Sequence, residues 1–162
     1  MKFPTTLAVL LSIAVLAGCA SPRSFVPGQS DIMDVRNRAG LPTDIRFDRN
    51  GEELWEYASG PSGYETYLVR IGRDGKVKEV TQLVTEERML SITPGTMTKA
   101  DARHLLGRPS DESFFNGEAT WSWRARIVAQ PGFLVVRFNQ DGTVKDRMAL
   151  IDPSGGSRNG GK

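Results

Sequence analysis

Asp74-Gly75-Lys76-Val77 recurs 67 residues later as Asp141-Gly142-Thr143-Val144. Other structure-setting residues recur in the same order at an offset of 66 or 67, and the pairs are Pro27-Gly28 with Pro94-Gly95, Gly40 with Gly107, Pro42 with Pro109, Asn50-Gly51 with Asn116-Gly117, Trp55 with Trp121, and Tyr57 with Trp123. A fixed period is the signature of repeated supersecondary units. The sequence therefore predicts a tandem duplication, with one copy over residues 25–84 and the other over residues 85–151.

Each copy is predicted to begin with a short helix. Asp31 and Thr98 are candidate N-caps, and an Asp three residues after each of them fits a capping box. The glycine and proline that follow each helix favour a left-handed residue at the helix end and a stop to the helix. A further helix is predicted over residues 85–91, with Thr85 as its cap.

The remainder of each copy has strand character. Asn-Gly at residues 50–51 and 116–117 predicts two-residue hairpin turns, because both central residues of a type I′ turn need positive φ. Longer loops are predicted at 60–63 and 130–132. The predicted strands of the first copy are 45–47, 54–57, 67–71 and a last strand ending at 84. Those of the second copy are 114–115, 120–123, 133–138 and a last strand ending at 151. We expect an α+β fold, a tandem duplication of a helix, or two short helices, packed on a three- to four-stranded antiparallel β-meander.

Side chains alternate between the two faces of a strand, so residues two apart share a face. Trp55 with Tyr57, and Trp121 with Trp123, are predicted to form the core under the helices rather than ligand-stacking platforms.

The opposite face is both basic and apolar. It carries the candidate partner-binding residues Leu68, Arg70, Phe133, Val135 and Arg137. A face too apolar to be purely solvated is a candidate docking surface. The alternative is a flank partly covered by the other copy or by the segment between the copies.

Near the N-terminus, an apolar stretch follows the positive charge of Lys2 and ends with Leu16-Ala17-Gly18-Cys19. This arrangement describes a secretory signal peptide over residues 1–18 and resembles the lipobox of bacterial lipoproteins. The resemblance implies a diacylglyceryl group on the Cys19 thiol, acylation of the freed amine by a chain such as palmitate, and a mature chain that begins at Cys19. The alternative is an ordinary secretory signal that happens to contain a cysteine.

Cys19 is the only cysteine, so no internal disulfide or cysteine metal cluster can form. The residues after it, Ala20 and Ser21, lack the Asp that the lipoprotein rule associates with retention in the inner membrane. We therefore expect the periplasmic face of the outer membrane. Residues 19–24 are predicted to be a lipidated tether, and the stretch after Cys19 reaches roughly 17 Å at ~3.5 Å per residue. The Gly- and Ser-rich residues 152–162 are predicted to be a disordered tail.

Composition limits the partners. Without Lys2 the 21 basic side chains become 20 against 19 acidic ones, and this balance gives no general attraction for nucleic acid. No later apolar run reaches the ~18 residues of a membrane span. The lipid is thus the predicted membrane attachment.

The second copy resembles the SmpA/OmlA (BamE-like) family of outer-membrane lipoproteins in its fold-setting residues. These are Ile92, Pro94-Gly95, Met97-Thr98, Leu106-Gly107, Pro109, Trp121, Trp123, residues 136–138 and residues 142–144. The first copy is similar over residues 27–77. The resemblance implies a non-catalytic scaffold or accessory factor in envelope integrity or outer-membrane β-barrel protein assembly, with an envelope protein as partner.

The alternative function is a periplasmic module that inhibits or captures a hydrolase, since the tandem architecture also resembles the secreted β-lactamase inhibitor protein. An enzyme is not predicted, because His104 is the sole histidine, lies near a helix end, and belongs to no recognisable triad, metal cluster or phosphate loop. We expect no cofactor other than the covalent lipid, and no small-molecule substrate.

Overall fold

The computed structural model describes residues 21–59 and 63–153 and is an α+β structure with two four-stranded antiparallel sheets. The predicted signal peptide and Cys19 lie outside the described residues, as does most of the predicted tail. The helical elements are η1 (Pro22–Ser24, a 3-10 helix), α1 (Ile32–Ala39), α2 (Glu86–Leu90) and α3 (Lys99–Leu106). The strands are β1 (Asp44–Phe47), β2 (Glu53–Ala58), β3 (Thr66–Ile71), β4 (Val77–Gln82), β5 (Asp111–Phe115), β6 (Glu118–Ile127), β7 (Gln130–Phe138) and β8 (Val144–Ile151).

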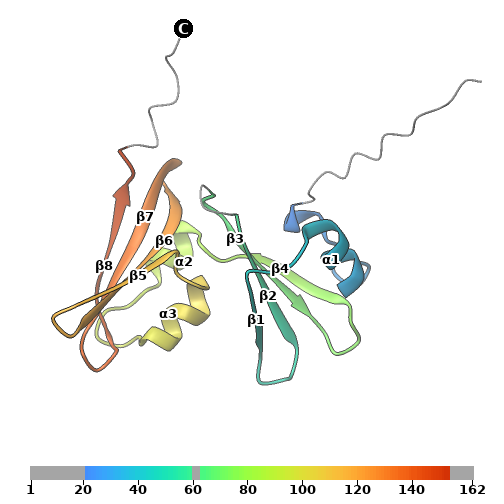
Figure 1. Cartoon of the computed structure of the whole chain (residues 1–162), viewed down its shortest axis with the longest axis horizontal. Coiled ribbons are helices and arrows are strands. Elements are labelled where there is room, and N and C mark those ends of the chain that lie inside the picture. Colours follow the sequence, from blue (N-terminus) through green and yellow to red (C-terminus); the bar gives the residue numbers. More distant parts are fainter. Residues whose placement is uncertain (1–20, 60–62, 154–162) are drawn as a thin grey trace, which may run out of the picture.

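Each sheet is a meander in which consecutive strands pair. We call η1, α1 and β1–β4 the N-terminal unit, and α2, α3 and β5–β8 the C-terminal unit. In Figure 1, α1 lies on the outer side of the N-terminal sheet, whereas α2 and α3 lie between the two sheets. The helices of the C-terminal unit therefore have a sheet on either side.

The predicted helix starts are confirmed. The side chain of Asp31 accepts hydrogen bonds from the backbone of α1, that of Thr98 accepts one from α3, and both caps are closed capping boxes. Thr85 caps α2 by accepting from the backbone N–H of Arg88 at 3.3 Å. The glycines at the ends of the longer helices depart from the predicted left-handed conformation, because Gly40 has φ 79° and ψ −155° and Gly107 has φ 78° and ψ −166°. This region of backbone space is open essentially to glycine alone.

The two Asn-Gly turns differ. Asn116 and Gly117 have φ of 50° and 80° and form the predicted two-residue turn, whereas at residues 50–51 only Gly51 has a positive φ. The prediction of a two-residue turn there is wrong, because Asp48 Oδ1 accepts from the backbone N–H groups of Asn50 and Glu52 and closes a wider loop.

The second long loop is also absent from its predicted place. Residues 130–132 lie in β7, and the chain reverses instead at Val128 and Ala129, which have φ of 48° and 64°. Gly132 is needed inside the strand, since a Cβ at this position would collide with the Leu150 carbonyl oxygen of β8. The loop prediction is wrong because a glycine in a strand pattern can also mark a place where two strands approach closely, as Gly132 does.

The segment predicted to be an extended tether is partly folded onto the N-terminal unit. Pro22–Ser24 form η1, and the Arg23 guanidinium lies 2.6 Å from Glu65 and also donates to Tyr67. The chain is therefore held against β3 from Arg23 onward, which leaves less free length than an extended segment ending at Ser24.

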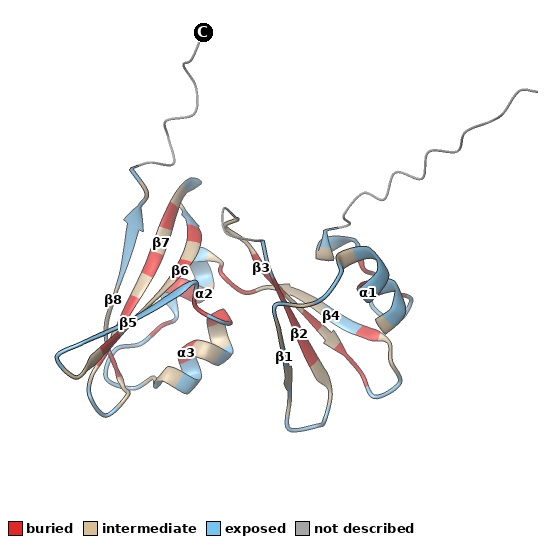
Figure 2. Ribbon diagram, in the orientation of Figure 1, coloured by how far each residue is buried: buried red, intermediate tan, exposed pale blue. Residues whose placement is uncertain are grey.

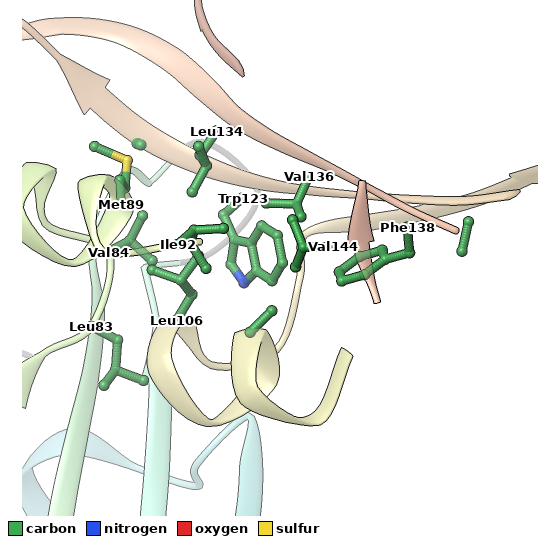
Figure 3. Packing of buried hydrophobic residues seen from close by; sticks show 13 residues of the cluster. Leu83, Val84, Met89, Ile92, Leu106, Trp123, Leu134, Val136, Phe138 and Val144 are labelled. Atoms are coloured by element: carbon green, nitrogen blue, oxygen red, sulfur yellow. The ribbon is translucent and has the colours of Figure 1, made fainter. Parts of the chain in front are cut away.

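The core faces are those that strand alternation predicts. In the N-terminal unit Trp55, Tyr57, Val69 and Ile71 are buried together with Val35 of α1. Figure 2 shows the alternation of buried and less buried residues along β6 and β7. Figure 3 shows the C-terminal cluster, in which the following labelled residues pack together: Leu83, Val84, Met89, Ile92, Leu106, Trp123, Leu134, Val136, Phe138 and Val144.

Trp123 anchors this C-terminal cluster. Its side chain is 1% exposed, and its indole Nε1–H donates to the carbonyl oxygen of Gly107 at 3.0 Å. Trp121 is only partly buried and contacts Trp123 edge-on, with ring centroids 6.0 Å apart. Leu83 and Val84, which lie in the segment assigned to the first copy, pack into the same cluster.

Candidate protein-docking surface

Each sheet has a second face, opposite its own helix, built from three cross-strand rows. On the N-terminal sheet the rows are Leu54, Arg70 and Glu79; Glu56, Leu68 and Thr81; and Ala58, Thr66 and Leu83. We call this the covered face. On the C-terminal sheet the rows are Thr120, Arg137 and Asp146; Ser122, Val135 and Met148; and Arg124, Phe133 and Leu150. We call this the open face.

The two faces correspond position by position. The strand order and register of the sheets agree, and both third strands carry an irregularity at one position, after Arg70 and after Arg137. Arg70 and Arg137 therefore occupy matched sites, as do Leu68 and Val135. Each residue of the open face can therefore be compared with its counterpart on the covered face.

The covered face is occupied by the C-terminal unit. Glu56 has no exposed surface, and its carboxylate accepts from Arg103 of α3 at 3.1 Å, from the backbone N–H of Arg108 at 2.7 Å and from Arg46 at 3.3 Å. Arg103 also donates to Asp44 of β1 at 2.5 Å. A buried carboxylate requires such cationic and N–H partners, because an isolated buried charge is strongly unfavourable.

Two of the predicted partner-binding residues lie on this covered face. Leu68 packs against the buried cluster of the C-terminal unit. Arg70 makes ion pairs with Asp48 at 2.8 Å, with Glu52 at 3.5 Å and with Glu79 at 3.6 Å. Leu68 thus contacts the C-terminal unit, as in the alternative of a flank partly covered by the other copy, whereas Arg70 is paired within its own unit.

The other three predicted residues, Phe133, Val135 and Arg137, lie on the open face and are half-buried. Sequence analysis missed the neighbouring β8 side chains Met148 and Leu150, which are 38% and 47% exposed. The contrast with the covered face is direct, since Leu83, at the position matched to Leu150, is 1% exposed. The open face thus combines three rows of apolar and charged side chains that the described chain does not cover with a helix layer.

The charges of the open face are partly paired. Arg137 donates to Asp146 through two nitrogens, Nε at 2.8 Å and Nη2. This hydrogen bonding lowers the pKa of Asp146 and raises the pKa of Arg137. Such a pair at the surface fixes side-chain direction while adding little stability.

A groove of about 370 Å³ adjoins this face where the two units meet. The N-terminal unit contributes Thr66 to its lining, and the C-terminal unit contributes Arg108, Ser122, Arg124 and Phe133. Arg124 closes part of the rim, because it donates to the Tyr64 hydroxyl at 2.8 Å and stacks 4.6 Å from the centroid of that ring.

His104 is exposed in the last turn of α3 and lines a small cavity with Arg46 and Arg70. Residues 21–59 and 63–153 contain no group of three or more His, Cys, Asp or Glu side chains placed to hold a metal ion. Among the same residues, no helix combines the length and hydropathy needed to cross a membrane.

The structure is a two-unit α+β fold, in which the described helices leave one face of the C-terminal sheet uncovered. Residues 81–148 match the family model described as "Outer membrane protein assembly factor BamE domain". The match runs from β4 to β8, so it includes both helices and all four strands of the C-terminal unit and supports a BamE-like class for that unit. It spans less than half of the 162-residue chain.

No curated protein matches the chain. Among solved structures, a DUF4309 family protein (YjgB) from Bacillus subtilis is 16% identical, with a TM-score of 0.31 over 80% of this chain and 84% of that chain. An extracellular protein containing a SCP domain from Bacillus anthracis is 13% identical, with a TM-score of 0.31 over 94% of this chain and 50% of that chain. This chain thus spans half the length of the second protein.

Proposed function

We propose that the chain is a lipoprotein of the outer membrane that acts as a non-catalytic scaffold or accessory factor in outer-membrane β-barrel protein assembly or envelope integrity. The observation that carries the proposal is the match of the C-terminal unit to the BamE domain model. The open face belongs to this same unit, and it is the surface through which we propose that the protein contacts its envelope partner.

The lipid anchor is part of the proposal. Cys19, at the end of Leu16-Ala17-Gly18-Cys19, is the proposed acceptor of the diacylglyceryl group, and we propose no other cofactor. Two or three acyl chains make anchoring effectively permanent. Because Arg23 is fixed to Glu65 and Tyr67, the anchor would hold the N-terminal unit close to the periplasmic face of the membrane.

The matching registers of the two sheets support a further part of the proposal, that the chain is a tandem duplication of a domain of the SmpA/OmlA type. In this view the N-terminal unit has become a support for the C-terminal one. Its sheet binds α3 internally, and the C-terminal sheet is left to contact other proteins.

A complementation experiment tests the function. Deletion should sensitise cells to large antibiotics and detergent and lower the amounts of outer-membrane barrel proteins, because barrel assembly would lose a factor. The wild-type chain should restore both, whereas Cys19→Ser should remain at the inner membrane as an uncleaved precursor and fail. Normal permeability and normal barrel-protein amounts after deletion would contradict the proposal.

Two matched variants then test the open face. Leu150 on the open face and Ile45 on β1 are 47% and 48% exposed, so replacing either with Glu removes similar apolar surface. Leu150→Glu should fail to complement at normal protein amounts, whereas Ile45→Glu should complement. Equal complementation by both variants would show that the contact surface lies elsewhere.

A further inference from the structure

We infer that the open face binds helix α1 of a second copy of this chain, in the way that the covered face binds α3 within one chain. The inference rests on the proposed role of the open face as a contact surface and names its partner. The described residues already contain one such contact, between α3 and the covered face. They leave the open face and the outer side of α1 without a contact of this kind.

The first component is the outer side of α1. Both α1 and α3 are eight-residue helices that begin with a capping box, so their residues correspond in order from Ile32 and Lys99. Met33 and Leu41 are 57% and 73% exposed and correspond to Ala100 and Arg108 of the internal contact. Ala100 lines a cavity with Leu54 and Arg70 of the covered face, and the backbone N–H of Arg108 donates to Glu56. An exposed methionine and leucine at the two matched positions fit an apolar partner surface.

The second component is charge. Arg36 of α1 corresponds to Arg103, whose Nη2 lies 2.5 Å from Asp44 Oδ2 in the internal contact. Asp44 pairs in register with Glu56, and its match Asp111 pairs in register with Ser122. Arg36 and Asp111 are thus the outward-facing counterparts of a salt bridge that the structure shows between Arg103 and Asp44. Neither makes an ion pair within the described residues.

The third component is how the open face differs from the covered face. Ser122 replaces the buried Glu56, so a second helix need not supply an arginine and a backbone N–H group to neutralise it. Met148 replaces Thr81, and Leu150 retains the apolar character of Leu83. The open face therefore favours more apolar side chains at the contact positions than the covered face does. Met33 of α1, and Leu41 just beyond the end of that helix, stand where the α3 segment has Ala100 and Arg108.

The chain's own C-terminal segment is not a suitable occupant. Residues 154–162 read Ser-Gly-Gly-Ser-Arg-Asn-Gly-Gly-Lys and contain no large apolar side chain. Such a segment has nothing to bury against Val135, Met148 and Leu150.

Contact between two different surfaces does not close a pair but propagates from copy to copy. Confinement of the copies to one membrane surface would raise their effective concentration and favour stacking. The test is therefore made in intact cells that produce the full chain, by crosslinking single introduced cysteines with a short bismaleimide.

Arg36→Cys and Asp111→Cys, produced in two separate chains of one cell, should give a crosslinked dimer, and neither variant alone should give one. Both substitutions in one chain should give a ladder of higher species. Wild type, whose sole cysteine is Cys19, measures the background. Asp44→Cys with Arg103→Cys in one chain is the matched control, because it should crosslink within the chain and leave the molecular mass unchanged.

A charge exchange adds a readout that misfolding would not reproduce. With Met33→Cys and Val135→Cys as the crosslinked pair, Arg36→Asp should reduce the dimer several-fold, and adding Asp111→Arg should restore it. Absence of the mixed dimer, a dimer from Arg36→Cys alone, or adducts of Asp111→Cys only with other proteins would each overturn the inference. The crosslinking experiment does not measure barrel-protein amounts, so its outcome is independent of the test of the proposed function. If the crosslinked ladder forms but deletion leaves the envelope normal, the proposed function is contradicted and the inference stands.

Discussion

Arg103 on α3 donates a hydrogen bond to the fully buried carboxylate of Glu56 on β2, with 3.1 Å between Nη1 and Oε2. The other carboxylate oxygen accepts from the backbone N–H of Arg108 at 2.7 Å. These bonds join the two units through a carboxylate that has no exposed surface. They hold α3 against the covered face of the N-terminal sheet. The open face, which is the corresponding face of the C-terminal sheet, has no such helix on it within the described residues.

Replacing Glu56 with Gln should destabilise the chain by up to about 3 to 5 kcal/mol, because removing the buried carboxylate leaves Arg46 and Arg103 with Asp44 alone as their shared counterion. Urea denaturation of the purified chain measures this change. Asp146→Asn is the control, since Asp146 and Arg137 retain 34% and 42% of their side-chain exposure and such exposed pairs add little stability. Equal losses in the two variants would contradict a buried network between the units.

Gly107→Ala should lower the melting temperature more than Gly40→Ala. Both glycines have the same unusual backbone conformation, so both variants carry a similar backbone strain of about 1 to 3 kcal/mol. At Gly107 a Cβ would also lie 2.8 Å from Glu56 Oε1 and 2.8 Å from Leu83 Cδ1, whereas at Gly40 it would meet nothing within 4 Å. The difference between the two variants, measured by thermal unfolding, therefore reports on packing between the units, and no difference would mean that this packing is loose.

Reversing the charge of Arg70 should be far more disruptive than reversing that of Arg137. Arg70→Glu adds a carboxylate to Asp48, Glu52 and Glu79. Arg137→Glu loses one ion pair, with Asp146, and has Glu118 as a further carboxylate nearby. Like charges in close contact are destabilising, and more so where partial burial reduces screening. Circular dichroism melting should show an early transition for Arg70→Glu and a nearly unchanged one for Arg137→Glu. The opposite order would mean that the two faces are assigned to the wrong environments.

Stability should fall in alkali through Tyr57. Burial raises the pKa of Tyr57 to about 12, above the value of about 10 in an unfolded chain. The unfolded state therefore loses its proton first, and the stabilisation present below pH 10 is lost progressively as the pH rises from 10 toward 12. Urea midpoints across this window should decline more steeply for wild type than for Tyr57→Phe. Parallel curves would show that Tyr57 titrates normally.

Local chemistry was predictable where it alone determines the backbone. The capping boxes that start at Asp31 and Thr98 and the Asn116-Gly117 turn form as the sequence predicts, because each depends on groups within a few residues. The turn at Val128 and Ala129 was not predictable in this way. Its residues are unfavourable for positive φ, and the pairing of β6 with β7 on either side holds them there.

The faces were predictable only in part. Alternation places Leu68 and Val135 on equivalent faces, but the similar local sequences Leu68-Val69-Arg70 and Val135-Val136-Arg137 cannot reveal which face another unit covers. That choice depends on contacts distant in the sequence, above all on Glu56. A charged residue is seldom buried without partners, so the burial of Glu56 follows from Arg103 and the backbone of Arg108 rather than from the strand pattern.

Photo-crosslinking from Val135 and Leu68 tests the central claim most directly, because these matched residues differ mainly in whether their face is open. A photoreactive amino acid is placed at one position or the other in the full chain, and adducts are identified by mass spectrometry after irradiation of intact cells. We predict intermolecular adducts from Val135, with a second copy of the chain and with envelope proteins, and none from Leu68. Adducts from Leu68, or their absence from Val135 in a folded and correctly localised protein, would contradict the account.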